Sequence, residues 1–478
     1  MRAYRSVWLI FVILVTGFAP GCDKNGTVTP PVDDEPHFWL TDPGRNIRFV
    51  EQPTGLSRDE AAGAATIRID PATTYQEIDG FGFALTGGSA LHLHNMSAPA
   101  RAALLEEMFG QEGNAIGTSY LRVSIGASDL DAEVFSYNDL PSGQTDVNMD
   151  RFTLDRDRQH VIPMLKEILT INPAIKIMGS PWSPPIWMKT NGSSVGGSLK
   201  AEYYEAYAKY FVKYIEGMAA EGITIDAITP QNEPLHPGNN PSLLMPANEQ
   251  AAFIKTALGP AFHRAGIDTK IVIYDHNADR PDYPIAILDD PAARLFVDGS
   301  AFHLYGGEIS ALSQVHNRHP DKNIYFTEQW VGAPGNLAGD LRWHTRELTI
   351  GATRNWSRNV IEWNLAADQN QDPHTVGGCT QCLGAVTIQG DAVTRNSAYY
   401  IIAHAAKYVR PGSIRIASEE VAGLPNVAFE TPTGSIVVIV LNDSHAITTF
   451  NLNAGGTTWR SSLYPGAVAT YVLPPSSP

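Results

Sequence analysis

The chain has 478 residues, of which 43% are apolar and 18% are charged. This composition is typical of a globular protein and argues against disorder, and the length suits one large domain and one small one. The formal net charge of -16 at pH 7 repels phosphate groups, so the sequence argues against nucleic acid and anionic lipid as partners and favours an uncharged ligand.

The N-terminus has the form of an export signal. Arg2 and Arg5 precede the apolar run VWLIFVILV, which is too short to remain as a membrane-spanning helix. The following TGFAPGC ends at Cys22 and resembles a bacterial lipoprotein signal, in which the cysteine becomes the acylated first residue, although Ala19 stands where Leu is usual. We expect residues 1–21 to be a signal peptide.

On this interpretation Cys22 is lipidated, residues 22–40 form a linker, and the lipid anchor is the protein's only attachment to a membrane. The expected location is then the bacterial cell envelope, at the outer membrane or the cell surface. Secretion, or release into the periplasm without a lipid, is the alternative.

Strand-like and helix-like segments alternate over roughly three hundred residues, which is typical of an α/β fold with parallel strands. Apolar residues recur at helical spacing in residues 98–109, 157–171, 202–222 and 247–266. The predicted strands lie at residues 77–85, 119–125, 174–180, 225–231, 270–275, 299–305, 323–329 and 359–365.

Eight strands with helices between them predict a (β/α)8 TIM barrel, which we place at residues 76–405. A doubly wound open sheet is the rival α/β fold. Such a sheet usually has a glycine-rich phosphate-binding turn after its first strand, and the sequence FGFALTGG lacks that form.

After the barrel, residues 406–478 contain short strands separated by Gly, Pro and Asn turns, which predicts a small β-sandwich. Strands are also expected in residues 41–75, before the barrel begins. We therefore predict a side domain that is built from both ends of the chain.

Cys379 and Cys382 lie close together in the sequence GGCTQCLG. In an exported protein this spacing favours a short disulfide, because the compartment is oxidising. A C-x-x-C pair also occurs in zinc sites and redox motifs, but no second Cys or His pair stands at matching spacing. We predict a disulfide and no metal site.

Catalytic side chains of a TIM barrel stand at the C-terminal ends of its strands. Glu233 follows the fourth predicted strand in IDAITPQNEPLH, and Glu328 follows the seventh in YFTEQW. A single Glu at a strand end is more often a surface residue. A facing pair fits glycoside hydrolysis, in which one carboxyl protonates the leaving oxygen and the other attacks the anomeric carbon, about 5 to 5.5 Å away when configuration is retained.

Aromatic residues at other strand ends support a sugar ligand, because aromatic rings can cover the apolar faces of pyranose rings. Any one of them, taken alone, is more often a core residue. The candidates are Trp182, Trp187, Tyr305, Trp330 and Trp363.

Several motifs in one order together resemble glycoside hydrolase family 30: GFGFALTGGSA, LRVSIGASD, SPWSPPIWMKTNG, NEP and TEQW. The resemblance runs from about residue 40 to the C-terminus. It implies a (β/α)8 barrel with an attached β-sandwich, and a two-step retaining hydrolysis without a metal or an organic cofactor. The family includes enzymes that hydrolyse glucosylceramide and enzymes that hydrolyse β-1,6-glucans.

The resemblance also implies roles for single residues. Glu233 matches the family's general acid/base and Glu328 its nucleophile, while Arg122 lies where the family supports the nucleophile. The chain has Leu304 where the family often has Trp. The positions that match substrate-binding residues are Asp129, Trp182, Asn232, His303, Tyr305 and Trp363.

We expect Arg122 and Tyr305 to hold Glu328 ionised, and the negative charge of Glu328 to raise the pKa of Glu233. The exported context favours a β-1,6-glucan as substrate, with glucosylceramide as the alternative. A surface lipoprotein that binds carbohydrate without cleaving it is a hypothesis of another class. The presence of both glutamates argues against it.

Two further segments have weaker interpretations. His92 and His94 have the spacing of a metal pair, but they lie at an apolar helix start without a third ligand, so structural histidines are the better interpretation. The sequence DHNADR, residues 275–280, ends the fifth predicted strand and either contacts substrate or caps a loop.

Overall fold

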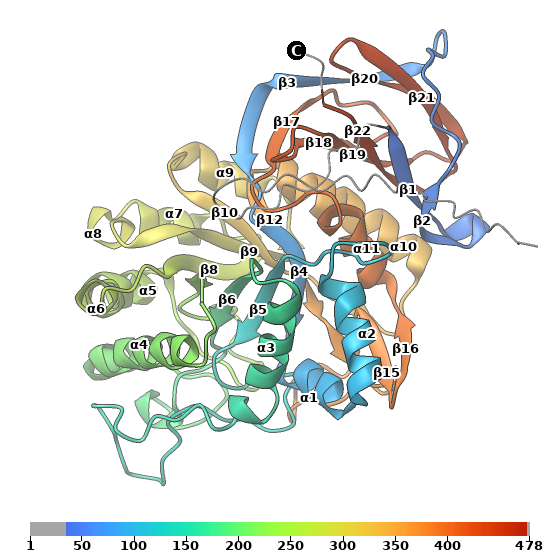
Figure 1. The fold of residues 1–478 in the computed structure, drawn as a ribbon. Helices are drawn as coiled ribbons and strands as arrows, with labels where there is room; N and C mark the ends of the chain where they lie inside the picture. The colour runs from blue at the N-terminus through green and yellow to red at the C-terminus, as the bar shows by residue number, and fades with distance from the viewer. Residues whose placement is uncertain (1–34, 476–478) are drawn as a thin grey trace, which may run out of the picture. The chain divides into compact units, whose positions relative to one another are not determined.

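The computed structural model describes residues 35–475. The predicted signal peptide and Cys22 lie outside these residues. Within them, parallel strands close into an eight-stranded barrel (Figure 1), in which the last strand pairs with the first. The strands are β4 (Gly80–Leu85), β5 (Tyr120–Ser124), β6 (Lys176–Ser180), β7 (Ala227–Ile228), β8 (Lys270–Ala278), β9 (Val297–Gly307), β10 (Asn323–Glu328) and β12 (Ser357–Asn364).

Helices surround the barrel (Figure 1), and α4 (Tyr204–Ala220) shows why the sequence forms them. Its buried residues Tyr207, Tyr210, Phe211 and Tyr214 recur at helical spacing, so one face is apolar and packs on the core. The other helices are α1 (Gly87–Asn95), α2 (Ala98–Phe109), α3 (Val161–Ile171), α5 (Ala247–Phe253), α6 (Gly259–Ala265), α7 (Asp282–Leu288), α8 (Pro291–Arg294), α9 (Ala311–Arg318), α10 (Leu337–His344) and α11 (Ser397–Ala406).

Shorter elements lie between the strands and helices of the barrel domain, and their strands form two small separate sheets. They are the 3-10 turns η2 (Asp157–Gln159), η3 (Ile186–Met188) and η4 (Ala201–Tyr203), the π-helical segments η5 (Ile254–Leu258) and η6 (Thr345–Ala352), and the strands β11 (Val331–Gly332), β13 (Ala366–Ala367), β14 (Cys382–Leu383), β15 (Val386–Gln389) and β16 (Ala392–Arg395). A helix with the length and apolarity that a membrane span requires is absent from residues 35–475.

The glycine-rich motif GFGFAL forms β4, and every residue of this strand is buried. At Gly82, a Cβ atom would lie only 1.8 Å from the backbone oxygen of Tyr120 in β5. Any larger residue at this position would push the two strands apart. The glycine therefore permits the close approach of β4 and β5.

The barrel interior consists of an apolar layer and a polar layer. The apolar layer contains Tyr120, Met178, Ala227, Val272, Ala301, Tyr325 and Ile361. Because side chains alternate along a strand, the residues two positions further on face the same interior. On five of the strands these residues are polar and fully buried: Arg122, Ser180, Thr229, His303 and Thr327.

The side domain takes its strands from both ends of the chain (Figure 1). The N-terminal strand β1 pairs with the C-terminal β22, with Leu40 opposite Ala469, and β3 lies between β17 and β20. The prediction of a TIM barrel with a β-sandwich built from both chain ends is confirmed. The strands are β1 (His37–Asp42), β2 (Ile47–Gln52), β3 (Ala65–Glu77), β17 (Ile414–Ser418), β18 (Asn426–Glu430), β19 (Ile436–Leu441), β20 (Thr448–Ala454), β21 (Thr457–Leu463) and β22 (Val468–Leu473), with the 3-10 turn η1 (Pro43–Arg45) after β1.

Buried polar contacts join the side domain to the barrel. His404 of α11 lies between two hydroxyls, with Nε2 2.8 Å from Thr41 Oγ1 and Nδ1 2.9 Å from Thr470 Oγ1. Burial lowers the pKa of His404 to about 3, so the ring stays neutral. Arg354 Nε donates to the Asn426 backbone oxygen at 2.6 Å. These contacts fix α11 and the residues that follow η6 against the small sheet.

Asp157, a buried residue of η2, provides a test of stability against pH. Tyr137 donates to Asp157 Oδ2 at 2.6 Å, and burial raises the pKa of Asp157 to about 7. The unfolded value is about 3.9, so the neutral acid stabilises the fold below about pH 4, and this contribution is lost as pH rises through about 7.

The Asp157→Asn side chain stays neutral at every pH. As the pH rises from about 4 to about 8, the unfolding free energy of this variant is expected to increase by about 1 to 3 kcal/mol relative to that of the wild type. Chemical denaturation at several pH values measures the difference. The exposed Asp150→Asn serves as control and should show no such trend. A pH-independent difference for Asp157→Asn would contradict the expectation.

Candidate active site

Glu233 stands beyond the short strand β7, at the C-terminal mouth of the barrel. Its backbone is left-handed, with φ 44°, a conformation that costs a non-glycine residue of the order of 1 kcal/mol. Two hydrogen bonds hold this turn: the Glu233 N–H donates to the Asp275 oxygen at 2.9 Å, and the Asn232 N–H donates to the Pro181 oxygen at 2.8 Å. The carboxyl is therefore presented by a rigid support, with 13% of its side chain exposed.

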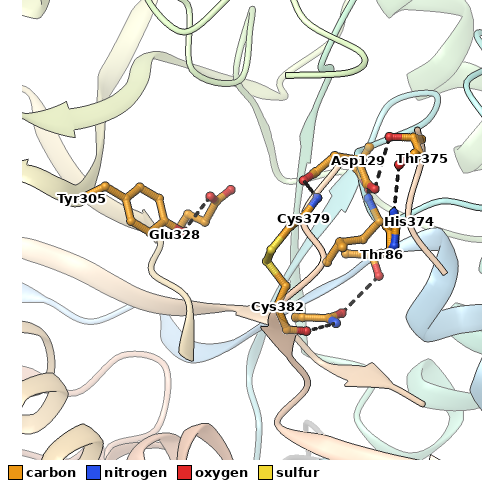
Figure 2. Close-up of a disulfide and its surroundings, with 11 residues drawn as sticks. Thr86, Asp129, Tyr305, Glu328, His374, Thr375, Cys379 and Cys382 are labelled. Atoms are coloured by element: carbon orange, nitrogen blue, oxygen red, sulfur yellow. Dashed lines mark hydrogen bonds between the residues drawn. A yellow bond between two sulfur atoms is a disulfide. The ribbon is translucent and has the colours of Figure 1, made fainter. Parts of the chain in front are cut away.

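Glu328 is the last residue of β10, and two donors contact its carboxyl. Arg122 Nη1 donates to Oε2 at 2.5 Å, and the Tyr305 hydroxyl donates to Oε1 at 3.0 Å (Figure 2). Burial and the charge of Glu328 raise the pKa of Tyr305 well above its usual value, so the phenol keeps its proton. Both donors expected from the sequence thus contact Glu328.

Asp275 is the centre of the polar layer below the two glutamates. It accepts hydrogen bonds from Arg122 Nη2 at 2.8 Å, from Thr229 Oγ1 at 2.7 Å, from Thr327 Oγ1 at 2.7 Å and from His303 Nε2 at 3.1 Å. Burial alone would raise its pKa, but the charge of Arg122 and the contact with His303 outweigh burial and hold the pKa well below its usual range. The ionised Asp275 fixes both Arg122 and His303.

His303 connects the two glutamates. Its Nδ1 lies 3.2 Å from Glu233 Oε1 and 3.9 Å from Glu328 Oε1. These two contacts limit the separation of the carboxyl oxygens to about 7 Å, which admits the about 5 to 5.5 Å of a retaining glycosidase. Burial lowers the pKa of His303, but the charges of Glu328, Asp275 and Glu233 outweigh it and raise the pKa to about 9. The ring therefore carries a proton on both nitrogens.

Both carboxyls open into one cavity of about 330 Å³ at the barrel mouth, a size near the lower end of small-molecule pockets. The rings of Trp182 and Trp363 stack at 5.3 Å on one side of it. The cavity is lined by Asp129, Trp182, Asn232, Glu233, Leu235, His236, Asn239, His276, Asn277, Tyr305, Glu328, Trp330, Trp363, Cys379 and Cys382.

A disulfide between Cys379 and Cys382 forms one wall of this cavity (Figure 2). The Cys379 N–H donates to Asp129 Oδ2 at 3.2 Å, and the Cys382 oxygen accepts from Asn364 Nδ2 at 3.3 Å. Burial, followed by the charge of Glu328, raises the pKa of Asp129 to about 7. The disulfide loop therefore holds in place a carboxyl that faces the cavity.

The fold agrees with comparisons to known proteins. The model of the glycosyl hydrolase family 30 TIM-barrel domain matches residues 78–409, and that of the family 30 β-sandwich domain matches residues 412–477. The chain belongs to glycoside hydrolase family 30. It is therefore a glycosidase.

Relatives of this family 30 glycosidase include an endo-1,6-β-D-glucanase of Neurospora crassa, 34% identical over 88% of this chain and 90% of the relative. The lysosomal acid glucosylceramidase of Mus musculus is 28% identical over 88% and 86% of the two chains. Among solved structures, an endo-β1,6-glucanase superposes with a TM-score of 0.86 at 35% identity, over 92% of this chain and 99% of the other. SrfJ from Salmonella typhimurium gives a TM-score of 0.85 at 29% identity, with the same coverage.

The two glutamates of the family 30 enzyme differ in pKa, in the direction opposite to the one expected. Burial alone raises the pKa of Glu233, but the contact with His276 at 3.5 Å, the hydrogen bond with His303 and the charges of both rings outweigh burial and hold the pKa well below its usual range. Burial raises the pKa of Glu328, against the charges of His303 and Arg122. The expectation of a raised Glu233 is wrong for this arrangement, because two histidines lie against that carboxyl.

Most of the residues that the sequence singled out in the family 30 enzyme meet at this cavity. Arg122 and His303 lie behind the glutamates, fully buried, and act on them rather than lining the cavity. Leu304 packs in the hydrophobic core instead of forming a wall of the cavity. Trp187, expected at the rim, lines a different cavity.

The end of strand β8 and the loop after Glu233 add cavity residues that the sequence did not assign as a site. Within the segment 275–280, His276 and Asn277 line the cavity, and Asp275 anchors the layer below it. Leu235, His236 and Asn239 come from the loop that follows Glu233. For His276, Asn277 and Asp275, the DHNADR motif at the end of the fifth predicted strand was the only indication in the sequence. The loop after Glu233 gave no comparable signal, because its residue types are common in turns.

Three side chains of the family 30 site have the arrangement of metal ligands. In the part of the chain that the structure describes, the donors Glu233, His276 and His303 lie within 4.8 Å of one another, close enough for a shared ion. His303 has both ring nitrogens directed at carboxylates and a pKa raised to about 9, and a protonated ring has no lone pair for a metal. Ion pairing explains this cluster.

His92, expected as a structural histidine, lies outside this cluster, with Nε2 2.8 Å from the Asp372 oxygen.

Proposed function

We propose that this protein is a retaining endo-β-1,6-glucanase, with Glu328 as nucleophile and Glu233 as general acid/base. The chemistry is supported by one observation: both carboxyls contact the same His303 Nδ1 and line the same cavity of about 330 Å³. The substrate is supported by the relatives. Those named endo-1,6-β-D-glucanase are 33–34% identical, and those named glucosylceramidase are 28–30% identical.

In the first step, an oxygen of Glu328 attacks the anomeric carbon and forms a glycosyl ester. The bond from this carbon to the glycosidic oxygen breaks, and that oxygen takes a proton from Glu233. His303 carries a proton 3.2 Å from Glu233 Oε1. Transfer along this hydrogen bond gives Glu233 the proton that the leaving oxygen takes, and the proton that Glu233 removes from water in the second step returns to His303.

In the second step, a water molecule attacks the same carbon while Glu233 accepts its proton, and the ester bond to Glu328 breaks. Two inversions restore the β configuration. As the negative charge returns to Glu328, Arg122 and Tyr305 stabilise it by donating hydrogen bonds to the carboxylate. The sugar is held by groups that face the cavity: Asp129, Trp182, Asn232 and Trp363.

Product analysis tests the proposal. The purified protein is incubated with β-1,6-glucan, β-1,3-glucan and glucosylceramide, and the products are identified by mass spectrometry. We expect β-1,6-linked oligosaccharides of mixed length early in the reaction, since an endo enzyme cuts within the chain. Free glucose and ceramide as the preferred products would instead assign the protein to glucosylceramide hydrolysis. Binding of glucan without any released sugar would contradict the enzymatic proposal as a whole.

A further inference from the structure

A second cavity, of about 720 Å³, lies at the same mouth of the barrel and is larger than the catalytic one. We call it the side cavity. It lies between the loop 134–145 after β5 and the loop 183–203 after β6, with Pro241 at one edge. Loops at the C-terminal ends of TIM-barrel strands are where such enzymes bind their substrates.

The apolar lining of the side cavity includes an aromatic corner. The rings of Trp187 and Tyr203 meet edge to face at 5.0 Å. Trp187 Nε1 donates to both oxygens of Asn138, at 3.1 Å and 3.0 Å, which fixes the orientation of the indole. Beside them, Ile186 has 40% of its surface exposed. A rigid aromatic and aliphatic wall of this kind suits the C–H face of a pyranose ring.

The polar lining of the side cavity suits hydroxyl groups rather than a charged ligand. Lys189 Nζ donates to Ser183 Oγ at 2.9 Å, to the Ser194 oxygen at 3.0 Å and to the Ser242 oxygen at 2.6 Å, which are all neutral acceptors. Burial lowers the pKa of Lys189 to about 7. The remaining polar residues carry both signs or none, and include Asp139, Gln144 and Lys200. An uncharged polyol fits this mixture of donors and acceptors.

The side cavity adjoins the catalytic cavity along two loops. Trp182 lines the catalytic cavity, and the next residue, Ser183, lines the side cavity. Asn239 lines the former, and Pro241, two residues further on, lines the latter. One bound polymer can therefore reach both, because each β-1,6 linkage adds a freely rotating bond that lets the chain bend.

From these contacts we propose that the side cavity binds a second portion of the same β-1,6-glucan chain whose reacting glucose occupies the catalytic cavity. This inference rests on the proposed function and adds to it a site that separates long glucans from short glucosides. The side cavity contributes affinity for the polymer, and the reacting groups lie outside it.

Kinetics of Ile186→Ala and Tyr203→Ala on long β-1,6-glucan and on an aryl β-glucoside test the inference. For each variant we expect the ratio of kcat/KM for glucan to that for the aryl glucoside to fall about five- to tenfold, through KM for the glucan. Ile447→Ala is the matched control, since this Ile is 55% exposed on the side domain, and its ratio should equal that of the wild type. Thermal melts establish that each variant is folded.

A calorimetric titration of long and short β-1,6-gluco-oligosaccharides into Glu328→Gln, with and without Ile186→Ala, gives a second readout. The added substitution should weaken only the binding of the long oligosaccharide. An unchanged ratio, or equal loss on both substrates, would overturn the side-cavity inference while the proposed function stands. A wild-type protein that cleaves the aryl glucoside but leaves β-1,6-glucan intact would overturn the proposed function, and the inference with it.

Discussion

Glu328→Gln is expected to lower kcat on β-1,6-glucan by at least about 10⁴-fold. An amide is not a nucleophile, so the glycosyl ester cannot form. The fold should persist, because the amide oxygen still accepts from Arg122 or Tyr305, and Arg122 keeps its contacts with Asp275 and Asn232. Reducing-sugar release measures the rate, and circular dichroism verifies the fold.

The control for Glu328→Gln is Glu419→Gln, which removes a carboxylate from a surface ion pair with Arg68. Such exposed pairs contribute little to stability, so the control should keep the wild-type rate. Trapping gives an independent check, since a fluorinated glucoside with a good leaving group should label Glu328 in the wild type. A folded Glu328→Gln protein that retained a tenth of the native rate would refute the assignment of the nucleophile.

Glu233→Gln is expected to separate substrates by their leaving groups. On β-1,6-glucan the rate should fall about 10²- to 10⁴-fold, because the departing sugar oxygen needs a proton. On an aryl glucoside with an activated phenol, the first step needs no acid and should proceed at close to the native rate. The second step then becomes slow, because no base removes the proton of water.

This difference predicts a burst of phenol from Glu233→Gln, equal in amount to the enzyme. Added azide should restore turnover and yield a β-glucosyl azide, since an anion needs no base and attacks the ester from the β face. His303→Asn serves as a comparison, because it removes the ring that contacts both Glu233 and Asp275 and should lower the glucan rate less than Glu233→Gln does. Equal losses of Glu233→Gln on both substrates, without azide rescue, would contradict the acid/base role.

The periodicity of the sequence predicts the barrel well. All eight strands occur where apolar, β-branched runs predict them, and α2 has the predicted bounds 98–109. The predicted strand 225–231 is regular over only two residues, Ala227–Ile228. The chain then turns at Glu233, whose backbone is left-handed. The hydrogen bond from the Glu233 N–H to the Asp275 oxygen fixes this turn, and strand propensity does not.

The sequence predicts the motif-bearing site residues better than their surroundings. Asp275 shows why, since a period of two from Val272 would place Tyr274 in the interior. The register between β8 and β9 instead shifts at Tyr274, where both Tyr274 and Asp275 have positive φ, and Asp275 turns inward. A bulge of this kind follows from packing between strands. The same bulge positions His276 3.5 Å from Glu233, and this contact helps to lower the pKa of Glu233 below that of Glu328.

The two-ended side domain constrains the order in which the chain can fold during synthesis. Strands β1 to β3 are synthesised before the barrel, whereas their partners β17, β20 and β22 are synthesised after it, as the pairing of Leu40 with Ala469 shows. Until then the edges of β3 have no strand to pair with and are open to aggregation. The barrel can assemble earlier, from neighbours in the sequence. Closure of the small sheet therefore follows assembly of the barrel, because it needs the strands β17 to β22.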